Sequence, residues 1–177
     1  AALSNGQLIN YQNIASDVGL SAPTIAEYFQ ILEDTFLGFR LEPWLESKKR
    51  KAIQTAKFYF FDIGVCNFIC NKKMIEPQTT DWGDNFEHFI CMEIKCWIMY
   101  SGAKNKICFW RSQSKHEVDI IIDSSIGIEI KSTNRVQKKH LNGLLALMEE
   151  KITSRHILIS FDPIKRTENG IDFFHWT

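Results

Sequence analysis

Two short acidic segments in the second half of the chain have the residue types of a metal-dependent hydrolytic site. Asp119 interrupts the apolar stretch Val118–Ile122, and Glu129 and Lys131 alternate with isoleucines in Ile128–Lys131. Side chains alternate faces along a β-strand, so Glu129 and Lys131 project from the same face. Few residues separate the two segments, and we therefore expect them to be neighbouring strands of a hairpin.

The length of the turn decides whether the two acids meet. A three-residue turn at Asp123, Ser124 and Ser125 would place Asp119 directly opposite Glu129, with Cβ atoms roughly 5 Å apart. A two-residue turn would put the acids on opposite faces of the hairpin, because a shift of one residue reverses every side chain. We predict a loop with an odd number of residues.

Paired carboxylates of this kind suit a divalent cation. Adjacent carboxylates repel each other unless a proton or a cation lies between them. Mg²⁺ and Mn²⁺ prefer such oxygen ligands and also bind phosphate oxygens. We predict that Asp119 and Glu129 hold Mg²⁺ or Mn²⁺, which activates water and neutralises charge on a phosphodiester. Lys131 would complete the catalytic set by orienting the water or stabilising the developing charge.

Glu87 is the candidate third metal ligand. It shares an apolar stripe with Ile90 and Ile94 in a helix expected over residues 85–100, and it would reach the edge of the sheet. A second interpretation has equal support. In that interpretation Asp84 caps the helix and Glu87 completes a variant of the capping box.

These residues resemble the PD-(D/E)xK nuclease superfamily, although Val118 stands where that superfamily usually has proline. More narrowly, the whole chain resembles the C-terminal part of bacterial and archaeal AAA-type ATPases that carry a DUF4143 domain. The stretches behind this second resemblance run in order along nearly the full chain: Leu8–Asn10, Ile14–Gly19, Thr24–Tyr28, Ile31–Phe36, Lys57–Gly64, Gly83–Glu87, Phe109–Arg111, Glu117–Asp119 and Glu129–Ser132.

The resemblance implies a restriction-endonuclease-like α/β domain, with elements in the order α, β, β, β, α, β and a central mixed sheet flanked by helices. It also implies a P-loop ATPase domain ahead of residue 1 as a partner in the full-length protein. ATP would bind only there, because this chain has no G-x-x-x-x-G-K-[ST] motif. The implied activity is Mg²⁺-dependent hydrolysis of DNA. The alternative is a non-catalytic DNA- or protein-interaction module of that ATPase.

The N-terminal part has the pattern of a winged-helix domain. Helices are predicted over Tyr11–Val18 and from Ser21 to about Thr35, with Gly19 in the turn between them. Two strand-like stretches, near Phe36–Pro43 and Lys57–Asp62, would close on a basic tip as a wing. Residues 76–82 break the periodicity, so we predict a winged-helix domain over 1–76 and a nuclease-like domain over 77–177. In the second domain a single helix is expected over residues 136–151.

Several residues are candidate nucleic-acid contacts. They are the basic run Lys48, Lys49, Arg50 and Lys51, the helix residues Thr24 and Gln30, and Arg111. Each has an alternative. A charged loop tip explains the run, and an ion pair with Glu117 explains Arg111. The second helix also carries acids that phosphate repels, so docking to a protein is an equal explanation for it.

Composition excludes some classes of protein. The 21 basic and 21 acidic residues balance to a net charge of zero, which disfavours a non-specific DNA coat. Five cysteines without a C-x-x-C pair exclude a disulfide framework and a zinc finger, and free thiols in a reducing cytoplasm are expected. No apolar run is long enough for a membrane span. The sequence is compatible with a homo-oligomer.

Overall fold

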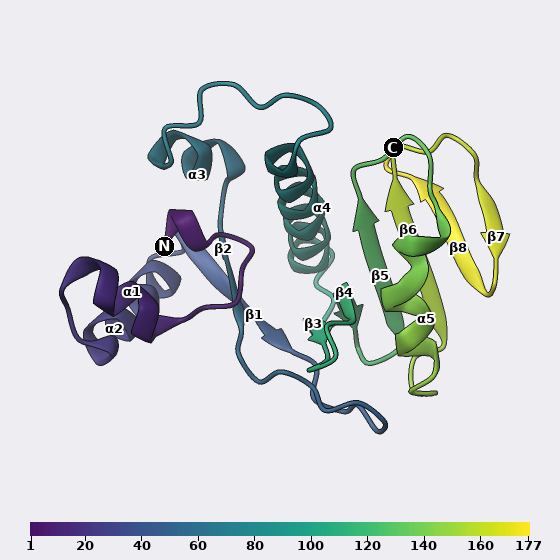
Figure 1. The fold of residues 1–177 in the computed structure, drawn as a ribbon, viewed down its shortest axis with the longest axis horizontal. Coiled ribbons are helices and arrows are strands. Elements are labelled where there is room, and N and C mark those ends of the chain that lie inside the picture. Colours follow the sequence, from purple (N-terminus) through teal and green to yellow (C-terminus); the bar gives the residue numbers. More distant parts are fainter. The chain divides into compact units, whose positions relative to one another are not determined.

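The computed structural model describes residues 1–177, which divide into two compact units (Figure 1). The first unit comprises Ala1–Leu41 and Thr55–Met74, and the second comprises Glu42–Gln54 and Ile75–Thr177. The chain forms five α-helices and eight β-strands with both parallel and antiparallel pairing, which confirms the mixed α/β prediction. Residues 42–54 were expected in the first domain, but they belong to the second unit.

The first unit is a set of short helices beside a pair of antiparallel strands. Its helices α1 and α2 begin after side-chain caps, and Gly19 ends α1 with φ 70°, in the left-handed region that glycine adopts without strain. Residues 38–41 of β1 pair with β2, and a core containing Ile25, Phe29 and Phe58 fills the interior. The elements are η1 Ala2–Ser4, α1 Tyr11–Val18, α2 Ala22–Asp34, β1 Gly38–Pro43, β2 Lys57–Phe60 and α3 Ile63–Ile69.

The second unit contains the predicted order α, β, β, β, α, β, followed by two further strands. Its sheet has the strand order β3-β4-β5-β6-β8-β7, with parallel pairing among β5, β6 and β8 and antiparallel pairing elsewhere. The elements are α4 Thr80–Tyr100, β3 Ile107–Arg111, β4 Glu117–Ile122, β5 Ile126–Lys131, η2 Lys138–Leu141, α5 Asn142–Met148, β6 Arg155–Ser160, β7 Arg166–Glu168 and β8 Ile171–His175.

Helices pack closely on this sheet. Helix α4 contacts β5, and α5 contacts β4 and β5. A Cβ on Gly127 of β5 would come within 2.6 Å of the Leu147 side chain of α5, so only a glycine fits beneath that helix without movement. Leu144, Leu147 and Leu158 are fully buried in the core between α5 and the sheet.

The structure corrects two predicted helices. Helix α4 begins at Thr80, and the Thr79 hydroxyl accepts a hydrogen bond from the Trp82 N–H at 3.2 Å. The prediction that Asp84 caps this helix is therefore wrong. The single helix expected over residues 136–151 is instead the short 3₁₀ helix η2 followed by the seven-residue α5.

The cysteines form no disulfide, as the sequence predicted. Burial raises the pKa of the Cys66 thiol to about 11 and that of Cys108 to about 12, so both remain protonated at neutral pH. The five thiols therefore contribute to packing, not to cross-linking. None of the helices has the length and apolar character that crossing a membrane requires.

Candidate functional site

The β4–β5 hairpin brings the two predicted acids together. Ile122 pairs with Ile126 across a three-residue turn, and the register continues through Ile120 and Ile128. Extending it by one residue sets Asp119 opposite Glu129. The predicted odd-numbered loop is confirmed, and its residues Asp123 and Ser124 take the positive φ values, 50° and 53°, that tight hairpin turns require.

A β-bulge on the other side of β4 positions Asp119. Cys108 of β3 pairs with Ile121, whereas Trp110 pairs with Val118, so β4 advances three residues while β3 advances two. Asp119 and Ile120 thus lie opposite one residue of β3, and such bulges redirect side chains. The Asp119 Oδ2 atom accepts the Ile130 N–H of β5 at 2.7 Å, which fixes the carboxylate across the hairpin.

Lys131 connects the two acids. Its Nζ lies 2.5 Å from Glu129 Oε1 and 3.7 Å from Asp119 Oδ2. The acids are about 5% exposed, whereas the Lys131 side chain is 33% exposed. The negative charges of Asp119 and Glu129 raise the pKa of Lys131 although burial alone would lower it. Lys131 is therefore a permanent cation, and it is the part of the site that solvent reaches.

The Glu129 carboxylate is incompletely satisfied. Burial raises its pKa well above the usual range, the charge of Asp119 raises it further, and Lys131 opposes the shift. Its Oε2 atom is buried and accepts no hydrogen bond. A Cβ on Gly143 of α5 would lie 3.2 Å from this oxygen and only 1.8 Å from the Glu117 carbonyl oxygen. The start of α5 therefore closes over the carboxylate and needs glycine to do so.

Glu87 belongs to the same electrostatic environment. Its negative charge helps to raise the pKa values of both Glu129 and Lys131, and it comes from α4, the helix that contacts β5. Because Thr79, not Asp84, caps the helix, the structure favours the other interpretation, in which Glu87 lies near Asp119 and Glu129. No group of three or more His, Cys, Asp or Glu residues is close enough to hold a metal by itself.

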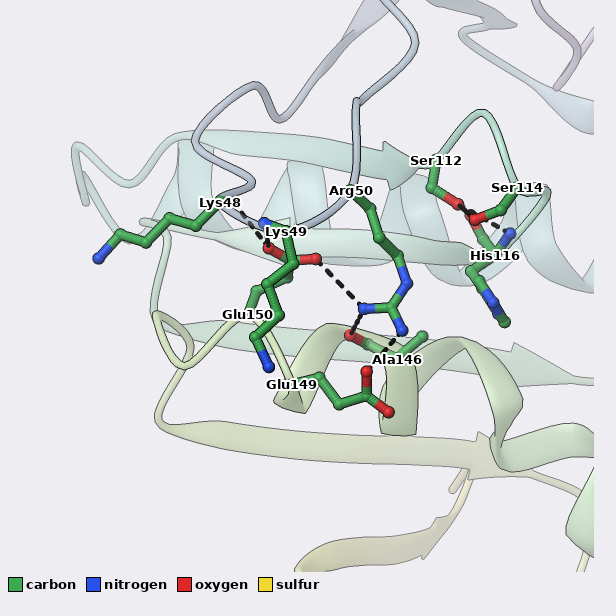
Figure 2. Close-up of polar contacts among 9 residues, drawn as sticks. All are labelled: Lys48, Lys49, Arg50, Ser112, Ser114, His116, Ala146, Glu149 and Glu150. Atoms are coloured by element: carbon green, nitrogen blue, oxygen red, sulfur yellow. Dashed lines mark hydrogen bonds and ion pairs between the residues drawn. The ribbon is translucent and has the colours of Figure 1, made fainter.

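The basic run lies in the second unit, not at the tip of a wing in the first. Figure 2 shows it beside the end of α5, where Glu150 Oε2 accepts the N–H groups of Lys48 and Lys49, each at 2.7 Å. Arg50 contacts Glu150 Oε1 at 3.3 Å and Glu149 Oε2 at 2.5 Å. The guanidinium is thus used within the fold, whereas the side chains of Lys48, Lys49 and Lys51 are exposed.

The other candidate nucleic-acid contacts have polar partners within their own units. Thr24 is in the first turn of α2, next to the Ser21 cap, and Gln30 donates a hydrogen bond to Asp34 at 2.9 Å. Arg111 ends β3 and contacts Glu117 at 3.1 Å, which confirms the predicted ion pair.

Sequence reasoning missed His140. The Gln137 N–H donates to its Nδ1 at 3.1 Å, and burial together with the charges of Lys139 and Lys131 lowers its pKa. The ring is therefore neutral at physiological pH and lies within the electrostatic reach of Lys131. One signal was available: residues 130–148 contain no acid, so Arg135, Lys138, Lys139 and His140 have no acidic neighbour within that segment.

Two family models match the chain. The model described as "Domain of unknown function (DUF4143)" matches residues 82–174, more than half of the chain, and includes all the site residues. The model described as "Domain of unknown function (DUF8612)" matches residues 1–76. No solved structure matches significantly.

Two curated mycobacterial proteins are similar to the chain. They are "Uncharacterized protein Mb2031c" of Mycobacterium bovis and "Uncharacterized protein Rv2008c" of Mycobacterium tuberculosis, each 23% identical over 135 residues. The match covers 73% of this chain but only 30% of each relative, so the chain corresponds to a minor part of those proteins.

Proposed function

This chain belongs to the DUF4143 family, and we propose that its second unit is a nuclease-like domain that hydrolyses DNA phosphodiester bonds with Mg²⁺ or Mn²⁺. The observation that carries the proposal is the convergence of Asp119, Glu129 and Lys131 at one end of the β4–β5 hairpin. The element order α, β, β, β, α, β and the mixed sheet support a restriction-endonuclease-like fold for this unit.

The residues fit a divalent cation. Glu129 Oε2 is a buried carboxylate oxygen without a hydrogen-bond donor, and a cation or a proton would relieve that cost. Asp119 and Glu129 would hold the metal, and the negative charge of Glu87 from α4 would favour it. Mg²⁺ accepts a site with one or two carboxylates because it retains water and substrate phosphate as further ligands. The metal would lower the pKa of the attacking water and neutralise charge on the phosphodiester.

The chain's own residues prepare the site for a polyanion. The Ile130 N–H holds Asp119 in one orientation, so its carboxylate needs little reorganisation. Lys131 offsets the charge of the acids and, as the most exposed of the three residues, is placed to contact a phosphate oxygen. The start of α5 covers Glu129 and keeps water away from one side of it.

Cleavage of single-stranded, duplex and branched DNA with Mg²⁺ or Mn²⁺ tests this function. Asp119→Ala, Glu129→Gln and Lys131→Met should each lower the rate about 100-fold or more. Glu117→Gln is the matched control, because it removes an acid of the same strand that pairs with Arg111. If the wild type and Asp119→Ala are equally inert on every substrate and metal, the proposed nuclease is ruled out.

We also propose that the first unit is a winged-helix domain. The helix pair α1 and α2 is joined through Gly19, and the antiparallel strands β1 and β2 follow. Its Thr24 and Gln30 are the proposed base contacts. A P-loop ATPase domain ahead of residue 1 is the proposed partner in the full-length protein, in which ATP would bind.

One observation favours a second function, a non-catalytic interaction module of that ATPase. Lys131 lies within 2.5 Å of Glu129, and an internal ion pair of this kind also stabilises a fold without any metal. Isothermal titration with Mn²⁺ separates the two functions. Binding of Mn²⁺ that Asp119→Ala abolishes supports the nuclease, and no binding up to millimolar Mn²⁺ supports the module.

A further inference from the structure

A strip of unpaired cations begins at the candidate site. Arg135, Lys138 and Lys139 are exposed, and their side chains form no ion pair within the chain. No acidic residue occurs between Glu129 and Glu149, so nothing nearby in the sequence neutralises them. Arg135 and Lys138 line one surface pocket together with Arg166, whose own charge is paired with Asp162 and Glu168. Unpaired cations of this kind suit a polyanion.

A pocket of aromatic and polar character lies at the start of this strip. It encloses about 480 Å³ and is lined by Ser132–Arg135 on one side and by Trp82 and Phe161 on the other. The Trp82 and Phe161 rings lie 6.0 Å apart with an interplanar angle of 31°. The same two rings line a neighbouring apolar pocket of about 280 Å³. The volume of the first pocket is in the range of small-ligand sites.

The loop that carries Arg135 is anchored, so the pocket is built into the fold. Asp162 is 5% exposed, and its Oδ2 atom accepts the Val136 N–H at 3.0 Å. The Arg135 N–H donates to the Thr133 hydroxyl at 3.2 Å. The backbone on both sides of Arg135 is thereby fixed, while its side chain remains exposed.

The pocket adjoins the candidate site through both of its walls. Ser132 follows Lys131 directly in the chain. A Cβ on Gly83 of α4 would lie 3.2 Å from the Ser132 hydroxyl, and Glu87 lies one helical turn beyond Gly83. A ligand in the pocket would therefore extend toward the acids.

We propose that this surface binds single-stranded nucleic acid, with phosphates on Arg135, Lys138 and Lys139 and an unpaired base against Trp82 and Phe161. Aromatic rings beside a cationic track bind single strands because every unpaired base offers a face for stacking, whereas duplex bases are already stacked. The inference names a substrate class for the proposed nuclease. Only cleavage of the bound strand rests on the proposed function; binding does not.

Fluorescence anisotropy in EDTA measures binding without cleavage. The probes are labelled oligothymidylate and oligouridylate of about 16 nucleotides, the upper end of single-strand site sizes, and a duplex of equal length. The single strands should bind more tightly than the duplex. Replacing Arg135, Lys138 and Lys139 with alanine should reduce the slope of log K against log salt concentration by about 2, from about 0.7 for each phosphate contact.

Matched variants separate this surface from general charge and exposed rings. Trp82→Ala should weaken single-strand binding about fivefold or more, and Trp82→Phe should retain most of it. The combined replacement of the exposed Lys73, Lys104 and Lys115 with alanine removes the same charge elsewhere and should leave the salt slope unchanged. Tyr100→Ala removes an 88% exposed ring of α4 and should leave affinity unchanged.

Three results would overturn the inference: tighter binding of the duplex, an equal loss of affinity in the two triple variants, or binding of polyglutamate with no binding of either oligonucleotide. Its failure is distinguishable from that of the proposed nuclease. Binding that depends on Trp82 and Arg135, without cleavage in Mn²⁺, removes the nuclease and leaves the binding surface. Cleavage with no effect of these variants on binding removes only the surface.

Discussion

Two buried glutamates near opposite ends of α5 have contrasting environments. Glu150 is 2% exposed; its Oε2 atom accepts the N–H groups of both Lys48 and Lys49, and its Oε1 atom contacts Arg50. Glu129 is 5% exposed, and one of its oxygens has no donor. The pKa of Glu150 is lowered and that of Glu129 is raised.

The contrast distinguishes a carboxylate that holds the fold together from one that, under the proposed function, is kept for chemistry. Burial disfavours the charge of both, but the donors around Glu150 outweigh that cost. At Glu129 the contact with Lys131 does not outweigh the cost of burial. An unsatisfied buried group in a folded protein calls for a functional explanation. The basic run was a candidate for DNA contact from the sequence, and its backbone at Lys48 and Lys49 donates hydrogen bonds to Glu150.

Glu150→Ala should give the largest change in stability. It leaves two part-buried backbone N–H groups without their acceptor and removes one of the two acidic partners of Arg50, a loss of about 4 kcal/mol in the free energy of unfolding. Urea denaturation at pH 7 measures it. Glu149→Ala is the matched control, because the Glu149 side chain is 57% exposed and its loss leaves the buried hydrogen bonds intact. Equal effects of the two variants would contradict the structural role of Glu150.

Gly143→Ala should be the next most damaging change, at about 3 kcal/mol. The new Cβ would lie 1.8 Å from the Glu117 carbonyl oxygen, and a backbone atom cannot move aside as a side chain can. Thermal unfolding would show the loss. The control Gly83→Ala meets only the Ser132 hydroxyl, at 3.2 Å, and alanine favours a helix, so its stability should be unchanged or higher. A harmless Gly143→Ala would show that α5 does not close tightly over Glu129.

The sequence predicted those parts of the site that local spacing determines. Alternation along Ile128–Lys131 and the length of the turn sufficed to place Asp119 opposite Glu129. The bulge in β4 was not predictable in this way, because it depends on how β3 pairs from the other side. The orphaned oxygen of Glu129 likewise depends on α5, which closes over it from elsewhere in the chain.

The basic run shows the same limit for predictions made from the charge pattern of the sequence. Four adjacent cations suggested an exposed loop tip, yet the backbone at Lys48 and Lys49 is bound by a glutamate about a hundred residues away. The helix expected from residue 85 begins at Thr80, because the hydroxyl of Thr79 caps it ahead of the apolar periodicity. A non-local partner in one case and an early cap in the other override the pattern that local sequence presents.

Acid titration should separate the contribution of Glu150 from packing. Burial alone would raise the pKa of Glu150, but the N–H groups of Lys49 and Lys48 and the Arg50 guanidinium hold it below 4.5. The folded protein therefore binds fewer protons than the unfolded chain between the two pKa values, and stability falls as the pH falls through that range. The deficit of Glu150→Gln, about 2 kcal/mol at pH 7, should shrink in acid. A deficit that is constant with pH would assign the effect to shape instead of charge.

Glu129→Gln should have the smallest effect and the opposite sign. The raised pKa of Glu129 means that the folded protein binds more protons than the unfolded chain above pH 4.5, so this group costs increasing stability as the pH rises toward its folded pKa. The neutral amide removes that cost, and its oxygen still accepts a hydrogen bond from Lys131. Lys131 keeps Asp119 as its ion-pair partner. We expect a gain on the order of 1 kcal/mol at pH 7 by urea denaturation, growing with pH. A loss comparable to that of Glu150→Gln would make the two glutamates alike and remove the case for a carboxylate kept for chemistry.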